Sequence, residues 1–297
     1  MPPILHGEDD IIFSLDECTS ALDQAGFDPR DRDSLASAAL SLRRLGNNSE
    51  FLAEILLAEL KGKHTQSHDS AYGPQTLVLS DLRQGYFLRA NIWPAEADSM
   101  FRASGAHSFS YGAPHDHNFD FLTLGYFGPG YASDYWEYDY ERVAGITGET
   151  AGLTYSGREI LEQGKIVHYR AHRDVHRQLP PAAMSVSLNI MAVNPAQGWH
   201  DQYAFDVEND RIVGVLNPTS TEVFLRMAIA IGGSENTDLA EHFGKAHPSD
   251  RIRLASYQAR SLLLDDPAER DKLWAKAEMS GSRLVEAQAR ENRERIA

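Results

Sequence analysis

Residues 184–191 read Met-Ser-Val-Ser-Leu-Asn-Ile-Met, a stretch in which apolar side chains alternate with polar ones almost without exception. Successive side chains of a β-strand point to opposite faces, so this alternation predicts a strand with one face in a core. Further segments rich in β-branched and aromatic residues lie at 76–79, 86–93, 119–127, 131–140, 166–169, 203–207 and 211–216. Many short strands punctuated by glycine and proline favour a sandwich or barrel over a parallel α/β sheet. We therefore expect a mainly β protein.

The chain on both sides of this β unit has helical periodicity. Ser14 and Glu17 have the form of a capping box, and apolar residues recur at helical spacing. The segments with this spacing are 34–45, 50–60, 219–231, 236–243, 249–264 and the residues from 267 onward. The expected division is an N-terminal helical segment (1–70), a β-barrel (75–216) and a C-terminal helical segment (217–297), with the polar stretch 61–74 as a linker. From their position alone, the helical flanks are expected to build a lid or the surface of a homodimer.

Composition excludes several classes of function. The chain has 297 residues, and its 28 Lys+Arg against 43 Asp+Glu give a formal net charge of −15. Binders of nucleic acid and of anionic membranes concentrate Lys and Arg, so we expect neither partner. The single cysteine, Cys18, excludes an internal disulfide and any site built from several thiolates. No signal peptide and no membrane span is visible in the sequence, which predicts a cytoplasmic protein.

Any transition-metal site must then be built from histidine and carboxylate. Six of the twelve histidines fall between residues 107 and 176, and the sharpest pattern is Tyr-Gly-Ala-Pro-His-Asp-His at 111–117. On a strand, His115 and His117 would point to the same face and place two imidazoles side by side. His176, before the strand at 184–191, is the best candidate for a third ligand. Neutral imidazole suits Fe, Cu, Ni and Zn. The alternative to a metal site is that His115 and His117 are surface histidines or hydrogen-bonded histidines of the core.

Two other side chains are candidate catalytic residues. Arg89 lies among apolar residues, where it would either clamp a substrate carboxylate or form an ion pair with one of the many acids. Tyr111, together with Asp116, flanks the histidine pair and is expected to orient the ligands through hydrogen bonds. His168 and His172 are expected to line a pocket or to be structural, because their spacing on a strand is too wide for chelation.

Four segments, in their order along the chain, can be compared with the motifs of a known protein family. They are Tyr-Phe-Leu-Arg at 86–89, Pro-His-Asp-His at 114–117 with Phe-Leu-Thr-Leu-Gly at 121–125, Val-His-Arg-Gln at 175–178 with Ser-Val-Ser-Leu-Asn-Ile at 185–190, and Ala-Phe-Asp at 204–206. Together they resemble the cupin superfamily, and within it the three-histidine, cysteine dioxygenase-type thiol dioxygenases. The resemblance implies a double-stranded β-helix (jelly-roll) barrel. It further implies a mononuclear Fe(II) held by His115, His117 and His176, with open positions for a substrate and O2, and Arg89 as the carboxylate anchor.

The sequence also departs from this family. Most cupins add a glutamate four or five residues after the second histidine, where this chain has Phe121 and Leu122. The thiol dioxygenases that form a cysteine–tyrosine crosslink would place its partners at Leu122 and Met191, so the crosslink is impossible here. Asn189 replaces the histidine of the strand at 185–190. These replacements argue against a free thiol as the substrate.

The sequence therefore predicts a non-haem Fe(II) oxygenase of the cupin fold, although another divalent transition metal would also suit the ligands. Its partners would be O2 and a small amino or carboxylic acid. Two alternatives stay open. One is a metal-dependent cupin that catalyses a non-oxidative isomerase or lyase reaction, and the other is a non-catalytic, ligand-binding regulatory cupin.

Overall fold

The computed structural model describes residues 1–5, 9–63 and 75–296. Helix α3 (Phe51–Lys63) extends into the expected linker, and the rest of that linker lies outside the described residues. The chain forms two compact units, Met1–Tyr138 with Leu153–Asn194, and Asp139–Gly152 with Pro195–Ala297. The boundaries 1–70, 75–216 and 217–297 expected from composition stay predictions.

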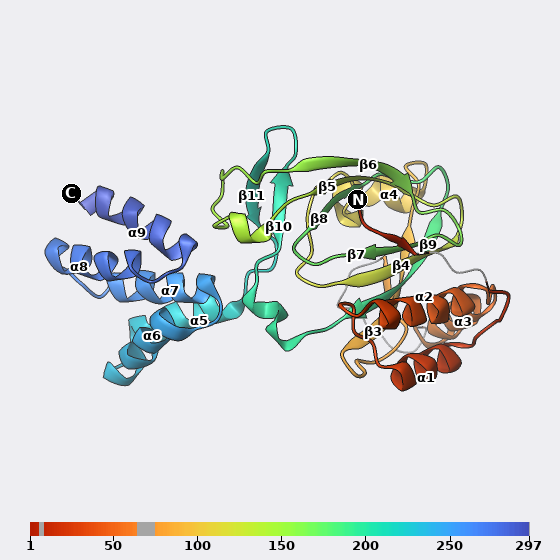
Figure 1. The fold of residues 1–297 in the computed structure, drawn as a ribbon, viewed down its shortest axis with the longest axis horizontal. Helices are drawn as coiled ribbons and strands as arrows, with labels where there is room; N and C mark the ends of the chain where they lie inside the picture. The colour runs from red at the N-terminus through yellow and green to blue at the C-terminus, as the bar shows by residue number, and fades with distance from the viewer. Residues whose placement is uncertain (6–8, 64–74, 297) are drawn as a thin grey trace. The chain divides into compact units, whose positions relative to one another are not determined.

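The first unit contains two antiparallel sheets (Figure 1). The larger has six strands in the order β1 (Ile4–Leu5), β7 (Ile166–Tyr169), β4 (Phe121–Phe127), β9 (Ser185–Ala192), β3 (Tyr86–Trp93) and β2 (Thr76–Val78). The smaller has the order β6 (Thr154–Ile160), β5 (Ala132–Glu137) and β8 (Asp174–Gln178). The alternating segment that predicted a strand is the long central strand β9, which pairs with both β3 and β4.

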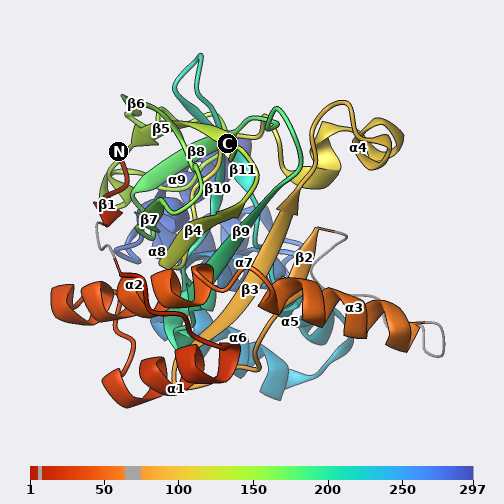
Figure 2. The same ribbon diagram turned by 90° about the vertical axis from the view of Figure 1, so that its right-hand side faces the viewer.

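Three N-terminal helices cover one face of the larger sheet: α1 (Leu15–Ala25), α2 (Arg32–Gly46) and α3 (Figure 2). The capping box is confirmed, since the Ser14 hydroxyl accepts from the Glu17 amide and the Glu17 carboxylate accepts from the Ser14 amide. Leu42 of α2 is fully buried with Leu88 and Leu122 of the sheet in one apolar core. This helical flank therefore packs on the sheet face that carries Leu88 and Leu122.

The opposite face of the larger sheet meets the smaller sheet. Side chains next to Leu88 and Leu122 in the sequence, such as Phe87 and Phe121, belong to a second core together with Tyr135 of β5. The hydroxyl groups of Tyr135 and Tyr169 of β7 join the two sheets at 2.8 Å. The strand alternation thus sends one set of side chains to the helices and the other into the space between the sheets.

Short elements complete the first unit. Helix α4 (Ser99–Ser104) and the 3-10 helix η1 (Ala106–Phe109) precede the histidine pair, and Phe101 and Phe109 pack near Tyr111. The Tyr111 segment then joins the edge of the smaller sheet through an isolated bridge to Gln178.

The second unit is mostly helical. Its hairpin of β10 (Tyr203–Asp206) and β11 (Arg211–Val215) confirms the expected pair of strands. The helices are α5 (Ser220–Ile231), α6 (Ser234–Ala246), α7 (Asp250–Ser261), α8 (Pro267–Glu278) and α9 (Arg283–Ile296), with the 3-10 helices η2 (Tyr140–Arg142) and η3 (Pro195–Trp199). Two small apolar cores hold them together, one around Leu225 and Ile252 and the other around Trp274 and Val285.

The expectation of antiparallel strands between helical flanks is confirmed, whereas a mainly β composition is not. Helical residues outnumber strand residues in the described part of the chain, because the helices are long and the strands short. The strands in the described ranges form open sheets, and their hydrogen bonds do not close the expected β-barrel. No helix within these ranges is long and apolar enough to cross a membrane.

Candidate metal centre

Two separate segments bring three histidines together at the edge of the smaller sheet. His115 forms an isolated antiparallel bridge with His176 of β8, in which each backbone amide donates to the other's carbonyl, at 3.1 and 2.9 Å. His117 follows two residues later and lies outside any regular strand. The pair was expected to share the face of one strand, so the structure differs in that only His115 is held by strand pairing.

The three imidazoles converge to a point. One ring nitrogen from each histidine lies within 4.8 Å of the corresponding atoms of the other two. The Nε2 atoms of His117 and His176 are 2.9 Å apart, and the ring centroids of the three pairs are separated by 4.5 to 5.0 Å. These three residues are the set predicted from the sequence, and within the described residues they are the only group of this kind.

Burial keeps these imidazoles in the form that binds a metal. It lowers the pKa of both His117 and His176 well below the usual 6.5, and neighbouring histidines lower them further. Burial also lowers the pKa of His115, although a hydrogen bond to the Ala113 carbonyl acts in the opposite direction. Neutral imidazole has a free lone pair, which a divalent cation requires.

Hydrogen bonding also selects the ligand atom of His115. Its Nδ1 lies 2.8 Å from the carbonyl oxygen of Ala113, which can only accept a hydrogen bond, so Nδ1 carries the proton. The lone pair of Nε2 is then available to a metal ion. The donor set is thus three neutral nitrogens from a largely buried site. Such a set fits Fe, Co, Ni, Cu or Zn and does not distinguish among them.

Aromatic rings wall the centre. Phe119 and Phe121 each lie 4.9 Å from the His117 ring, and the Tyr169 ring lies 4.7 Å from that of His176. Phe121 and Tyr169 stack on each other at 4.4 Å and nearly parallel. These rings pack against the imidazoles of His117 and His176 and limit their movement.

Arg89 faces the same interior. It lies on β3 between Leu88 and Ala90, which belong to the core under the helices, so the alternation of the strand directs Arg89 toward the space between the sheets. Its positive charge is close enough to contribute to the lowered pKa of His117. Asn189 of β9 is its neighbour in register. The side chain of Arg89 and the three histidines therefore face the same space between the two sheets.

Tyr111 and Asp116 are engaged in other bonds. The Tyr111 hydroxyl donates to the carbonyl oxygen of Pro94 at 2.9 Å, and burial raises the pKa of that hydroxyl. Asp116 is completely buried and accepts a hydrogen bond of 2.6 Å from the hydroxyl of Tyr138. Both contacts hold the loop that carries His115 and His117, and the catalytic assignment of Tyr111 stays a prediction.

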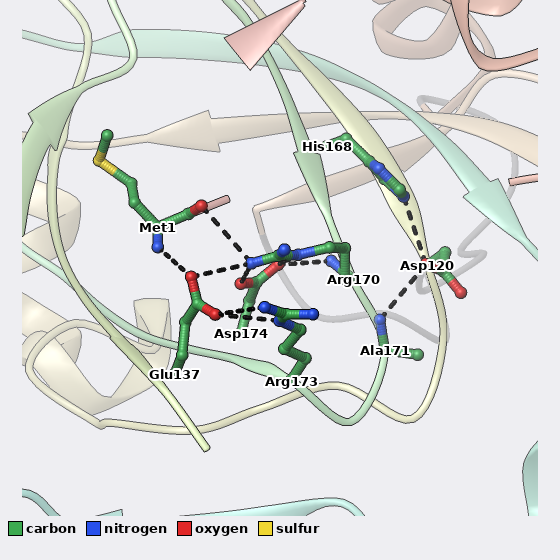
Figure 3. Close-up of polar contacts among 8 residues, drawn as sticks. All are labelled: Met1, Asp120, Glu137, His168, Arg170, Ala171, Arg173 and Asp174. Atoms are coloured by element: carbon green, nitrogen blue, oxygen red, sulfur yellow. Dashed lines mark hydrogen bonds and ion pairs between the residues drawn. The ribbon is translucent and has the colours of Figure 1, made fainter. Parts of the chain in front are cut away.

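The remaining histidines of the β unit lie outside the cluster. His168 on β7 is paired with Asp120, with 3.2 Å between Nε2 and Oδ1, which makes it structural (Figure 3). His172 belongs to the turn between β7 and β8, and His107 is exposed in η1. Sequence reasoning missed a backbone contact, the bond from the His172 amide to the His117 carbonyl at 2.8 Å. No side-chain pattern encodes such a bond, so the sequence offered no signal for it.

Comparison with known proteins adds little to this geometry. No family model and no curated protein matches the chain. Among solved structures, a provisionally assigned mannose-6-phosphate isomerase from Ralstonia eutropha JMP134 shares 13% identity over 43% of this chain and 100% of its own, with a TM-score of 0.22.

Two other solved structures also match the chain. A prolyl 4-hydroxylase from Phytophthora capsici shares 11% identity over 90% of this chain and 75% of its own, with a TM-score of 0.24. Vicilin from hazelnut, Corylus avellana, shares 9% over 52% and 42%, with a TM-score of 0.22. At these TM-scores the likenesses carry no argument, so function has to be argued from the site itself.

Proposed function

We propose that the first unit is a cupin-type domain whose His115, His117 and His176 hold a divalent transition metal, and that the protein is a metal-dependent enzyme. The observation that carries this proposal is the convergence of three neutral ring nitrogens within 4.8 Å from segments 59 residues apart. Two of the three, His117 and His176, are buried, and a shared cation would give these clustered ring nitrogens a common partner.

The finer proposal is a non-haem Fe(II) oxygenase, similar to the cysteine dioxygenase type, that acts with O2 on a small amino or carboxylic acid. A metal bound by three protein nitrogens supplies Lewis acidity and open coordination positions at which substrate and O2 can meet. Arg89 would hold the carboxylate of the substrate, because its guanidinium is directed into the same interior and can form a bidentate pair. Phe119, Phe121 and Tyr169 would keep water away from the ligands.

Two apolar side chains stand where the crosslink partners of the thiol dioxygenases would be, and both agree with a substrate that has no thiol. Leu122 is fully buried in the core under the helices, on the face of β4 opposite to the histidines. Met191 occupies the interior face of β9 near Phe121. A substrate bound by its carboxylate would thus meet apolar surface at the position of Met191, which favours a carboxylic acid with an apolar body.

The experiment compares metal content and turnover of the full chain with those of His115→Ala, His176→Ala and the control His107→Ala, in which an exposed histidine is removed. After anaerobic loading with Fe(II), we expect one metal per chain in the wild-type protein and the control, and little in the other two variants. Retention of full metal by His115→Ala and His176→Ala would refute the ligand assignment.

Consumption of O2 is then measured with a panel of amino and carboxylic acids. Substrate-dependent O2 uptake that is lost in Arg89→Leu and weakened in Arg89→Lys supports the oxygenase. Metal-dependent turnover that is unaffected by removing O2 would replace it with an isomerase or lyase. Stoichiometric metal with turnover of neither kind would instead favour a regulatory, ligand-binding cupin.

A further inference from the structure

The turn that connects β7 to β8, residues Arg170–Arg173, contacts one of the three clustered histidines and leads into the strand that carries another. Strand β8 carries His176, and the backbone amide of His172 donates to the carbonyl oxygen of His117 at 2.8 Å. Tyr169, the last residue of β7, packs its ring against both imidazoles, with centroids 4.7 Å from that of His176 and 6.5 Å from that of His117. The turn therefore follows directly on a residue that packs against both imidazoles, and it bonds to the backbone of one of them.

The backbone of this turn adopts an unfavourable conformation at the contact. His172 has a φ of 58°, in the left-handed region that residues with a Cβ atom avoid. Within the described residues, only Ser110 and Asp210 share a positive φ among residues other than glycine. Such a conformation persists only where the surrounding structure holds it, and it is concentrated at functional sites. Here it aims the His172 amide at the segment that carries His117.

Asp174 holds the turn from one side (Figure 3). Its buried carboxylate accepts from the backbone amide of Arg170 at 2.8 Å and from the guanidinium of Arg170 at 2.9 and 2.6 Å. One carboxylate thereby ties the first residue of the turn to the first residue of β8. Charge-assisted bonds of this kind are among the strongest that a buried carboxylate makes.

Asp120 and Glu137 hold it from the other sides (Figure 3). Asp120 accepts from Nε2 of His168 at 3.2 Å and from the backbone amide of Ala171 at 3.4 Å. Glu137, at the end of β5, accepts from the guanidinium of Arg173 at 2.9 Å and pairs with that of Arg170 at 3.2 Å. Three carboxylates from different segments thus contact three of the four residues of the turn, Arg170, Ala171 and Arg173, which flank His172.

We propose that the Arg170–Arg173 turn is a positioning element of the metal centre, in which the left-handed His172 holds the backbone of His117 in place through its amide. The inference rests on the proposed metal site. His117 lies outside any regular strand, so the sheet does not fix it as strand pairing fixes His115 and His176. The bond from His172 supplies the missing constraint, and a ligand displaced by a fraction of an ångström binds its metal less well.

The test measures Co2+ affinity of the metal-free full chain by competition with a chromophoric chelator. His172→Gly keeps both the amide and the left-handed conformation, so its affinity should stay within about threefold of the wild-type protein. In His172→Val the branched side chain opposes a positive φ, and we expect the Kd for Co2+ to rise about tenfold or more. His172→Asn, which tolerates this conformation, should restore most of the affinity.

A matched control separates this effect from general destabilisation. Asp210→Val introduces the same branched side chain at a φ of 54°, in the β10–β11 connection of the other compact unit. It should lower the melting temperature in the same way and leave the Kd for Co2+ unchanged. If His172→Val does not fold, His172→Ala takes its place, with an expected rise in Kd of about threefold to tenfold.

Three results would overturn the inference. They are an unchanged Kd in His172→Val, an equal loss in His172→Gly and His172→Asn, which would assign the effect to the imidazole, and an equal loss in Asp210→Val. A wild-type protein that binds no Co2+ would refute the metal centre itself, and with it the role of the turn. A wild-type protein that binds Co2+ normally while His172→Val also does so would refute the role of the turn alone.

Discussion

Replacing Tyr169 by phenylalanine removes one hydroxyl from the interior between the two sheets and leaves the ring in place. The Tyr169 hydroxyl is 2.8 Å from that of Tyr135, and the two residues are only 1% and 3% exposed. The loss of a buried hydrogen bond costs about 0.5–1.5 kcal/mol, and a buried polar group left without its partner costs about 1–3 kcal/mol. We therefore expect Tyr169→Phe and Tyr135→Phe each to lower the free energy of unfolding by about 1–3 kcal/mol.

The double variant distinguishes this reasoning from a simple loss of packing. With both hydroxyls gone, neither is stranded, so the double variant should lose less than the sum of the single variants, by about 1 kcal/mol or more. The assay is urea unfolding of the metal-free protein, followed by near-ultraviolet circular dichroism. Losses that add to within about 0.3–0.5 kcal/mol would refute the coupling of the two hydroxyls. Co2+ affinity should change little in Tyr169→Phe, because the ring that contacts His176 remains.

Three further results are expected. Leu42→Ala empties a fully buried position between α2 and the larger sheet and should lower the free energy of unfolding by about 3 kcal/mol, with metal content unchanged, as measured by urea unfolding and metal analysis. The Met1 ammonium group, and after it Arg173, lower the pKa of Glu137 from 4.5 to about 2, so the contribution of this carboxylate to stability is complete above pH 4.5 and is lost toward pH 2. In an acid titration, the free energy of unfolding of Glu137→Gln should therefore decrease less steeply over this range than that of the wild-type protein. An equally steep decrease would contradict the assignment. Burial lowers the pKa of His117 and His176 below 6.5, so below pH 6.5 the unfolded chain binds protons at these residues that the folded chain does not bind, and the metal-free protein should lose stability. A variant that combines His117→Gln with His176→Gln should lose less stability over the same range. The measurement is the melting temperature as a function of pH.

Much of the fold could be predicted from local patterns. The alternation at 184–191 identified β9, and the capping box at Ser14 identified the start of α1, because each pattern acts through neighbours in the chain. The balance of helix and strand was misjudged, since the strands are numerous but short and the helices are longer. Strand β6 was not predicted at all, and its residues Thr154–Ile160 are largely exposed, without the apolar alternation of a buried strand.

The candidate site was predicted in its members and not in its construction. His115, His117 and His176 were chosen from their spacing and from a resemblance, and they converge in the structure. The reason given for the first two, a shared strand face, holds only in part, because His117 lies beyond the bridge that fixes His115. For Arg89, the sequence left a carboxylate clamp and an ion pair equally open, and the strand alternation turned the guanidinium toward the histidines.

The sequence by itself determined the chemistry available to this protein: abundant histidine, one cysteine, an acidic net charge and strands with one apolar face. These are properties of residues and of their immediate neighbours. Only the tertiary structure decided that imidazoles 59 residues apart meet at 2.9 Å, and that a backbone amide in a left-handed turn holds one of them. Convergence of this kind depends on how strands pair and on where a turn places its amides, and neither is a property of any single segment.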